Sequence, residues 1–204
     1  MSQGIRYAVI TLFFCGIIFV GQGYAQDQAA PAKTEQELMM EKWQQFSTPN
    51  ENHKNLDFLA GEWTYTMKWW QSADTTPEES TGTTSSRWIL GGRFVQSDVK
   101  GESMGQPFEG INIIGYNNLS KEYNSIWIDN MSTAVMATTS QYDPATKTFT
   151  EQGSVSCPMT GETNRAVRGI SKIMDADHYS YEMFMNGLDG KEYKTMELIY
   201  SRVK

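Results

Sequence analysis

The sequence predicts an all-β fold, a closed antiparallel up-and-down β-barrel of about ten strands, with a short N-terminal helix. From residue 53 onward, Thr, Tyr, Trp, Val and Ile recur at every second position in runs separated by turn residues. That alternation is typical of strands with one buried face. A meander of such strands with short connections is most simply closed, because closure removes exposed edges. A β-sandwich of the same strands is the main alternative.

The N-terminus has the features of a Sec signal peptide. Arg6 precedes an apolar run over residues 7–20, and small residues follow, ending in Gly23-Tyr24-Ala25. The run is short for a membrane-spanning helix, which needs about 20 residues. We therefore expect residues 1–25 to be removed before Gln26 and the protein to be exported to the periplasm or the extracellular medium. A retained anchor is the alternative.

The mature chain is expected to be acidic and to form a single domain. The whole chain has 17 basic and 24 acidic residues, and the leader contains Arg6 but no acid, so the mature net charge is near −8. This balance argues against binding to nucleic acid or to an anionic membrane surface after signal cleavage. Only Cys157 remains in the mature chain, so no intramolecular disulfide is possible and packing must stabilise the domain.

Residues 26–52 are predicted to form a linker and a short helix, and residues 53–204 the barrel domain. The segment before Lys33 is rich in Gln, Ala and Pro and is typical of a flexible linker. Over residues 35–46, Leu38, Met39, Lys42 and Phe46 can share one helical face. This helix either packs on the domain or forms a loosely ordered arm.

Ten strands are expected in the barrel domain, joined by hairpins. Asp143-Pro144-Ala145-Thr146 suits a type I turn, and Leu188-Asp189-Gly190 offers Gly for a positive φ. Alternation places large side chains on one face, and a barrel of this size is either filled by them or holds one small ligand. Those side chains are Trp63, Tyr65, Met67 and Trp69 on the first strand, and Tyr179, Tyr181, Met183 and Met185 near the end. The expected strands span residues 61–70, 83–90, 93–101, 108–116, 122–130, 133–142, 147–156, 162–174, 177–186 and 191–203.

Several segments resemble known barrel families. His53 through Leu59-Ala60-Gly61-Glu62-Trp63 looks like the entry to the first strand of lipocalin-type and nitrobindin-type barrels, in which the Trp plugs one end. A closer resemblance, over about residues 53–204, is to the bacterial DUF1579 family of unknown function. It is carried by "ILGGRF" (89–94), "MGQPFEG" (104–110) and "WIDNM" (127–131). The resemblance implies a calycin-like barrel fold and no established reaction.

Two loop segments contain candidate binding residues. Gly91-Gly92-Arg93 predicts a tight hairpin in which Arg93 pairs with an acid or, alternatively, faces a ligand carboxylate or phosphate. The Gly-rich segment over residues 101–110 leads into a strand and not a helix, so it does not suit a phosphate-binding loop. We expect a shaped loop at the barrel mouth, with Met104 and Phe108 closing the opening.

Trp127 and Asp129 fall on the same strand face, so an inward Trp127 would place the carboxylate of Asp129 inside as well. A buried carboxylate needs a partner, which would be Arg93, Arg168 or a ligand cation. Alternatively, Asp129 and Asn130 cap a turn through side-chain to backbone bonds.

The sequence contains no catalytic or metal-binding signature. Nitrobindin-type barrels hold haem through an internal histidine, but the position of His178 after Asp175-Ala176-Asp177 places it at a rim, so no cofactor is expected. His53 is expected to be a rim or packing residue. Glu182 and Glu197 are most simply solvated carboxylates.

The leading hypothesis is an exported barrel that binds a small apolar or amphipathic ligand in an aromatic and Met-rich interior. A solid-cored structural or protein-interaction module, with Trp69 or Trp70 as surface anchors, is the alternative. An enzyme with Asp129 as acid or base is third. The candidate ligand-binding residues are Trp63, Arg93, Phe108, Trp127, Asp129 and Arg168.

Overall fold

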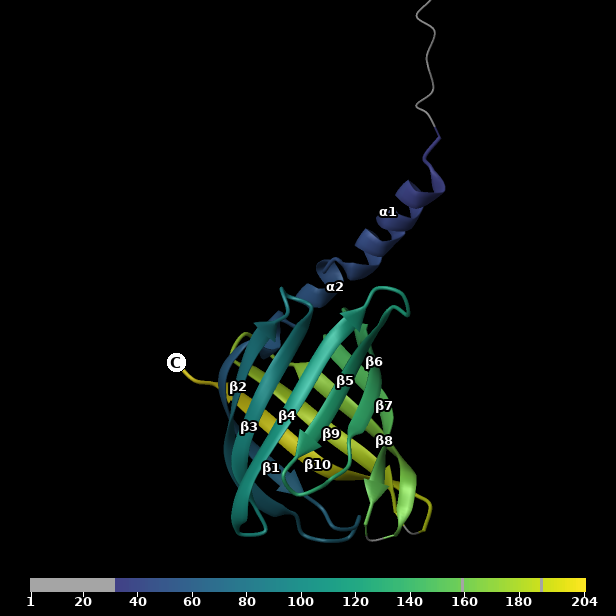
Figure 1. The fold of residues 1–204 in the computed structure, drawn as a ribbon. Helices are drawn as coiled ribbons and strands as arrows, with labels where there is room; N and C mark the ends of the chain where they lie inside the picture. The colour runs from purple at the N-terminus through teal and green to yellow at the C-terminus, as the bar shows by residue number, and fades with distance from the viewer. Residues whose placement is uncertain (1–31, 159, 188) are drawn as a thin grey trace, which may run out of the picture.

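The computed structural model describes residues 32–158, 160–187 and 189–204, which form one closed antiparallel barrel with a helical N-terminal segment (Figure 1). Each strand pairs with its sequence neighbours, and β1 closes the ring by pairing with β10. The expected leader over residues 1–25, most of the expected linker and Leu188 of the expected turn lie outside the described residues.

All ten predicted strands are present, and the closed ring confirms the barrel and excludes the sandwich. The largest differences from the expected starts are at β2, which begins five residues earlier, and β6, which begins three residues later. The strands are β1 (Gly61–Trp69), β2 (Glu78–Ile89), β3 (Phe94–Ser103), β4 (Gln106–Asn117), β5 (Glu122–Asp129), β6 (Met136–Asp143), β7 (Thr148–Cys157), β8 (Glu162–Ile173), β9 (His178–Asn186) and β10 (Glu192–Arg202).

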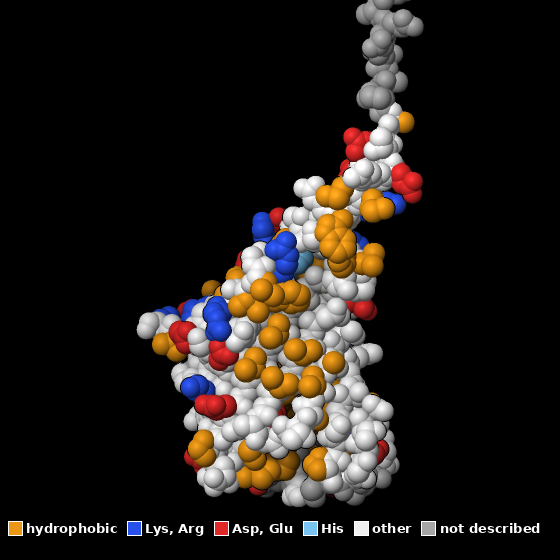
Figure 2. Space-filling model, viewed as in Figure 1, with side chains coloured by type: hydrophobic (Ala, Val, Ile, Leu, Met, Phe, Trp, Pro, Cys, Tyr) orange, Lys and Arg blue, Asp and Glu red, His pale blue; other side chains and the backbone are white. Residues whose placement is uncertain are grey.

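The predicted helix forms as α1 (Glu35–Ser47) and projects away from the barrel (Figure 1). Thr34 and Glu37 form a capping box at its start, which satisfies backbone donors that have no partner within the helix. None of its residues is buried. Its apolar side chains are therefore exposed to solvent, as Figure 2 shows: Leu38, Met39, Met40, Trp43 and Phe46.

One barrel residue holds the C-terminal end of α1. The Asn118 amide, in the β4–β5 turn, donates to the carbonyls of Gln45, Phe46 and Thr48 at 2.8–3.0 Å. These carbonyls lie at or just beyond the last helical turn, where intrahelical partners run out. No helix within the described residues is both long enough and apolar enough to cross a membrane.

The end of the barrel beside α2 (Glu51–Lys54) and η1 (Asp57–Leu59), hereafter the helix end, is closed by packed side chains. Leu56 is fully buried, and the Phe58 ring lies 5.7 Å from that of Phe149 and 5.2 Å from that of Tyr179. Trp63 is 1% exposed, and its indole N–H donates to the Leu59 carbonyl at 2.8 Å. The side chains of this helical segment and Trp63 thus close the helix end of the barrel, and together they are called the stopper.

Arg202 fastens this stopper to the last strand. Its guanidinium donates to the carbonyls of Ala60 at 2.8 Å, Phe58 at 3.2 Å and Ala176 at 3.1 Å. The same group lies 4.0 Å from the centre of the Trp63 ring, a distance typical of a cation–π contact. One side chain therefore joins η1, β1, β10 and the β8–β9 turn.

The opposite end of the barrel, hereafter the far end, is formed by the five connections that follow β1, β3, β5, β7 and β9, including the β3–β4 and β7–β8 hairpins (Figure 1). Met104 lies at the tip of the β3–β4 hairpin with a positive φ of 52° and is 79% exposed. It therefore extends into solvent, and the prediction that Met104 helps to close the opening is wrong.

Candidate functional site

A row of polar side chains crosses the inside of the barrel from β4 to β7. Ser125 Oγ lies 3.2 Å from Asn112 Oδ1, Thr138 Oγ1 lies 3.3 Å from Ser125 Oγ, and Thr138 Oγ1 lies 3.2 Å from Glu151 Oε2. Successive members are thirteen residues apart. Ser125 and Thr138 are direct partners in the β5–β6 ladder, whereas the other two contacts join diagonal neighbours two positions out of register, so one inward position of each of these four strands joins the row.

Glu151 reaches from β7 across β8 to β9. Its side chain lies over Gly169, where an added Cβ would come within 2.2 Å of Glu151 Oε1. The carboxylate can cross the intervening strand only because that position is a glycine. On the far side the hydroxyl of Tyr181 donates to Glu151 Oε1. We call Asn112, Ser125, Thr138, Glu151 and Tyr181 the polar belt.

Four of the five belt residues are less completely buried than the inward side chains nearer the helix end. Asn112, Ser125, Glu151 and Tyr181 face inward from the middle of their strands, yet each is only partly buried. Nearer the helix end, the inward side chains of Val95, Tyr123, Phe149 and Tyr179 are at most 6% exposed. The interior is therefore packed at the helix end and less completely filled at the belt.

The electrostatics of the belt centre on Glu151. Burial raises the pKa of its carboxyl, while the hydrogen bonds from Tyr181 and Thr138 act in the opposite direction. Burial and the nearby Glu151 charge hold the pKa of Tyr181 well above its ordinary value, so the phenol keeps its proton and donates it in the hydrogen bond. Two hydroxyl donors are thus directed at a carboxylate in a poorly hydrated place.

Aromatic and Met side chains surround the belt on the far-end side. Phe108 and Trp127 stack with ring centres 6.1 Å apart and planes 18° apart. Trp127 also covers Gly110, where an added Cβ would lie 2.5 Å from the indole ring. The apolar cluster contains Tyr65, Met67, Val99, Phe108, Trp127, Tyr181, Met196, Leu198 and Tyr200. A molecule in this part of the barrel would meet apolar side chains and the Glu151 carboxylate, with Arg165, the register partner of Val155, nearer the far-end rim.

Three predicted site residues come together near this cluster. Asp129 Oδ2 accepts the indole N–H of Trp127 at 2.7 Å, and Oδ1 accepts the backbone N–H of Met131 at 3.0 Å. Asp129 therefore caps the turn after β5 and orients Trp127, which stacks on Phe108. Asp129 thus has the turn-capping role that the sequence analysis gave as the alternative, and it does not pair with Arg93 or Arg168.

The two cationic residues among the predicted site residues, Arg93 and Arg168, lie outside the barrel. Arg93 is exposed in the β2–β3 turn and donates to the Leu90 carbonyl at 3.1 Å. Arg168 forms two hydrogen bonds with Glu192, at 2.9 and 2.6 Å, and lies over the Phe184 ring on the outer face. Their expected role beside an internal ligand is therefore wrong: Arg93 lies in the turn before β3 begins, and Arg168 points outward because neighbouring residues along a strand point to opposite faces. Trp63 is internal but belongs to the packed stopper.

The remaining candidates have structural surroundings. His178 lies at the rim, as expected, with Nδ1 2.8 Å from Asp175 Oδ1. His53 is buried beside Tyr116, and burial lowers its pKa. Lys194 bridges Glu182 and Glu197, so these two acids share a cation. Among the described residues, no group of three or more His, Cys, Asp or Glu side chains is arranged to hold a metal ion.

The predicted surface anchors are not free aromatic side chains. Trp69 and Trp70 are both partly buried, and Lys194 Nζ lies 5.3 Å from the centre of the Trp70 ring. A cation over one ring and partial burial of both leave little of either indole to insert into a partner.

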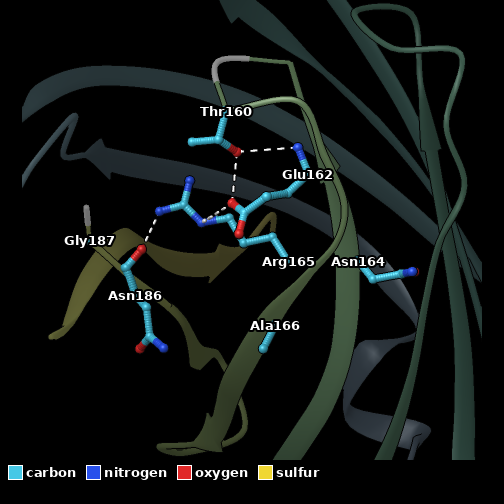
Figure 3. A pocket seen from close by; sticks show the side chains of 7 residues that line it. All are labelled: Thr160, Glu162, Asn164, Arg165, Ala166, Asn186 and Gly187. Carbon is cyan, nitrogen blue, oxygen red and sulfur yellow. Dashed lines mark hydrogen bonds and ion pairs between the residues drawn. The ribbon is translucent and has the colours of Figure 1, made fainter. Parts of the chain in front are cut away.

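A separate hollow of about 460 Å³ lies at the far-end rim (Figure 3). It opens where the pairing of β8 with β9 ends at Val167 and Met185. Arg165 spans it, with its guanidinium bonded to the Asn186 carbonyl and 3.8 Å from Glu162. Its lining is Thr160, Glu162, Asn164, Arg165, Ala166, Asn186 and Gly187. It is shallow and polar, and Glu151 of the belt is not among its lining residues.

Sequence reasoning missed most of the polar belt. Tyr181 was placed on the inward face, but Asn112, Ser125, Thr138 and Glu151 were not singled out. A signal was available, because Glu151 occupies an inward position between Phe149 and Gly153 in a strand that was correctly predicted. An acid at such a position must be satisfied by something inside the barrel.

Comparisons with known proteins place the fold and the family. The crystal structure of Rv2717c from M. tuberculosis matches with a TM-score of 0.59 at 13% identity, covering 77% of this chain and all of that one. The S-type phycobiliprotein lyase CPES from Guillardia theta matches with a TM-score of 0.52 at 11% identity, covering 78% of this chain and 96% of that one. At these identities the likeness is one of fold alone. No curated protein is detectably similar in sequence.

The family model described as "Protein of unknown function (DUF1579)" matches residues 48–202, which include the whole barrel. The match confirms the resemblance carried by residues 89–94, 104–110 and 127–131. The chain belongs to the DUF1579 family.

Proposed function

We propose that this protein is exported and binds a small amphipathic molecule inside the barrel, on the far-end side of the stopper. The observation that carries the proposal is the polar belt: a connected row of side chains that face inward, are partly buried and sit among aromatic and Met side chains. A few polar groups within apolar walls are typical of small-molecule sites. The solid-cored alternative requires these central side chains to be fully packed.

Binding inside the barrel can be separated from binding to its surface by two Trp substitutions on β7. Val155 faces inward beyond Glu151 toward the far end, whereas Gln152 faces outward. Nile red, a neutral apolar dye, would be titrated into each purified variant. Val155→Trp should weaken binding strongly because the indole occupies the space, and Gln152→Trp should leave the affinity within about twofold of the unaltered protein. Equal effects would place the dye on the outside and contradict the proposal.

The exported state and the natural ligand need separate measurements. Intact mass spectrometry of the protein recovered from the exported fraction should give a chain beginning at Gln26. Native mass spectrometry of the same sample would reveal a co-purifying molecule, and an absorption spectrum would reveal a haem. A full-length chain in the cytoplasm would contradict export without bearing on the binding site.

A further inference from the structure

The polar belt contains a carboxylate without a counter-ion. Among the described residues, no Lys, Arg or His side chain forms an ion pair with Glu151. The less buried acids Glu182 and Glu197 share Lys194. Buried carboxylates ordinarily have a cation or enough hydrogen-bond donors to replace water, and Glu151 has the two hydroxyls of Tyr181 and Thr138.

The hydrogen bonds around Glu151 suit the ionised form. A Tyr hydroxyl donates to Oε1 and the Thr hydroxyl lies within donating distance of Oε2, so each carboxylate oxygen has a donor directed at it. The crossing over Gly169 holds the group inside the barrel. The carboxylate is thus oriented, and its position borders the partly filled part of the interior.

The walls beside the belt suit an organic cation. Tyr65, Tyr181 and Tyr200 belong to one apolar cluster with Trp127, and the Tyr65 and Tyr200 ring centres lie 5.7 Å apart. Aromatic faces attract ammonium groups, and Met side chains adapt to an alkyl tail. A ligand carboxylate would instead be repelled by Glu151, and an alcohol would leave its charge unbalanced.

From these contacts we infer that the ligand is an amphipathic amine, whose ammonium group pairs with Glu151 and whose apolar part lies along the aromatic and Met side chains toward the far end. This inference rests on the proposed function and names its ligand class. The acidic balance of the whole chain, with 24 acidic and 17 basic residues, also favours the approach of a cation.

Three probes of equal chain length test the ligand class: decylamine, decanol and decanoate. Isothermal titration calorimetry at a pH of about 8 keeps the amine and the acid ionised. We expect the amine to bind at least about tenfold more tightly than decanol, and decanoate to bind most weakly. Because all three titrations use the unaltered protein, this comparison does not depend on the folding of any variant.

Two variants test the residue. Glu151→Gln removes the charge but keeps the size, and it should weaken amine binding by about tenfold while leaving decanol within about twofold. Glu182→Gln removes a carboxylate charge from the outer face and should alter neither the amine affinity nor the decanol affinity. If decanol binds as well as decylamine, or Glu151→Gln leaves the amine affinity unchanged, the amine inference fails and the proposed function stands. If none of the three probes binds, the proposed function fails as well.

Discussion

Arg202 offers the sharpest test of how the barrel is closed at the helix end. Replacing it with Met keeps an unbranched side chain but removes the guanidinium that donates to the carbonyls of Phe58, Ala60 and Ala176. It also removes the cation from the Trp63 ring. The change should detach η1 from the last strand without altering the β-ladders.

The expected magnitude follows from these contacts. A hydrogen bond from a charged donor contributes about 1.5–3 kcal/mol, and a cation–π contact contributes about 0.5–2 kcal/mol. A plain sum would overestimate the loss, because one ordered side chain makes all the contacts and carbonyls at the rim regain water. We expect Arg202→Met to lower the free energy of unfolding by about 3 kcal/mol. At about 2–4 °C per kcal/mol for a domain of this size, the melting temperature should fall by about 6–12 °C.

Urea unfolding followed by Trp fluorescence measures this loss. The matched control is Arg87→Met, because Arg87 pairs with Asp98 on the outer surface and its side chain is 55% exposed. An exposed ion pair of this kind contributes at most about 1 kcal/mol. Arg202→Lys keeps the charge but loses the planar fork, so its stability should lie between that of the unaltered protein and that of Arg202→Met. Equal losses for Arg202→Met and Arg87→Met would refute the assignment of Arg202 as the fastener of the stopper.

Three further outcomes are expected. Burial raises the folded-state pKa of Glu151 above its unfolded value, so the folded protein loses stability as pH rises from near the ordinary pKa of 4.5 through the raised pKa. Urea unfolding between pH 4 and 8 should show this loss and Glu151→Gln should reduce it, so parallel curves would contradict the buried carboxylate. Deleting residues 32–48 should change the free energy of unfolding by less than about 1 kcal/mol, because no residue of α1 is buried and the carbonyls that accept from Asn118 are exposed. A larger loss would mean that α1 packs on the barrel. Gly110→Ala should cost about 1–3 kcal/mol and change the Trp emission spectrum because the new Cβ meets the Trp127 ring at 2.5 Å. Gly105→Ala strains a residue with a φ of +71° but has open space around the new Cβ, so it should leave the spectrum unchanged.

The structure also explains why the site residues were harder to predict than the strands. Alternation in a single strand reports which side chains share a face, so it groups Trp63 with Tyr65 and Trp127 with Asp129. It does not report the height of a residue relative to the neighbouring strand. That height decides that Glu151 meets Thr138 and Tyr181.

The sequence by itself determined the ten strands, the single domain and the family, because hydrophobic alternation and turn residues are local properties that can be recognised without knowing which strands pair. Only the tertiary structure decided which polar side chains meet. The belt depends on strand registers that bring together inward residues thirteen positions apart in the sequence, and on a glycine at position 169 that lets one carboxylate cross a strand. It also decided that Arg93 and Arg168 lie outside and Arg202 closes one end, since these outcomes depend on how strands far apart in sequence are brought together.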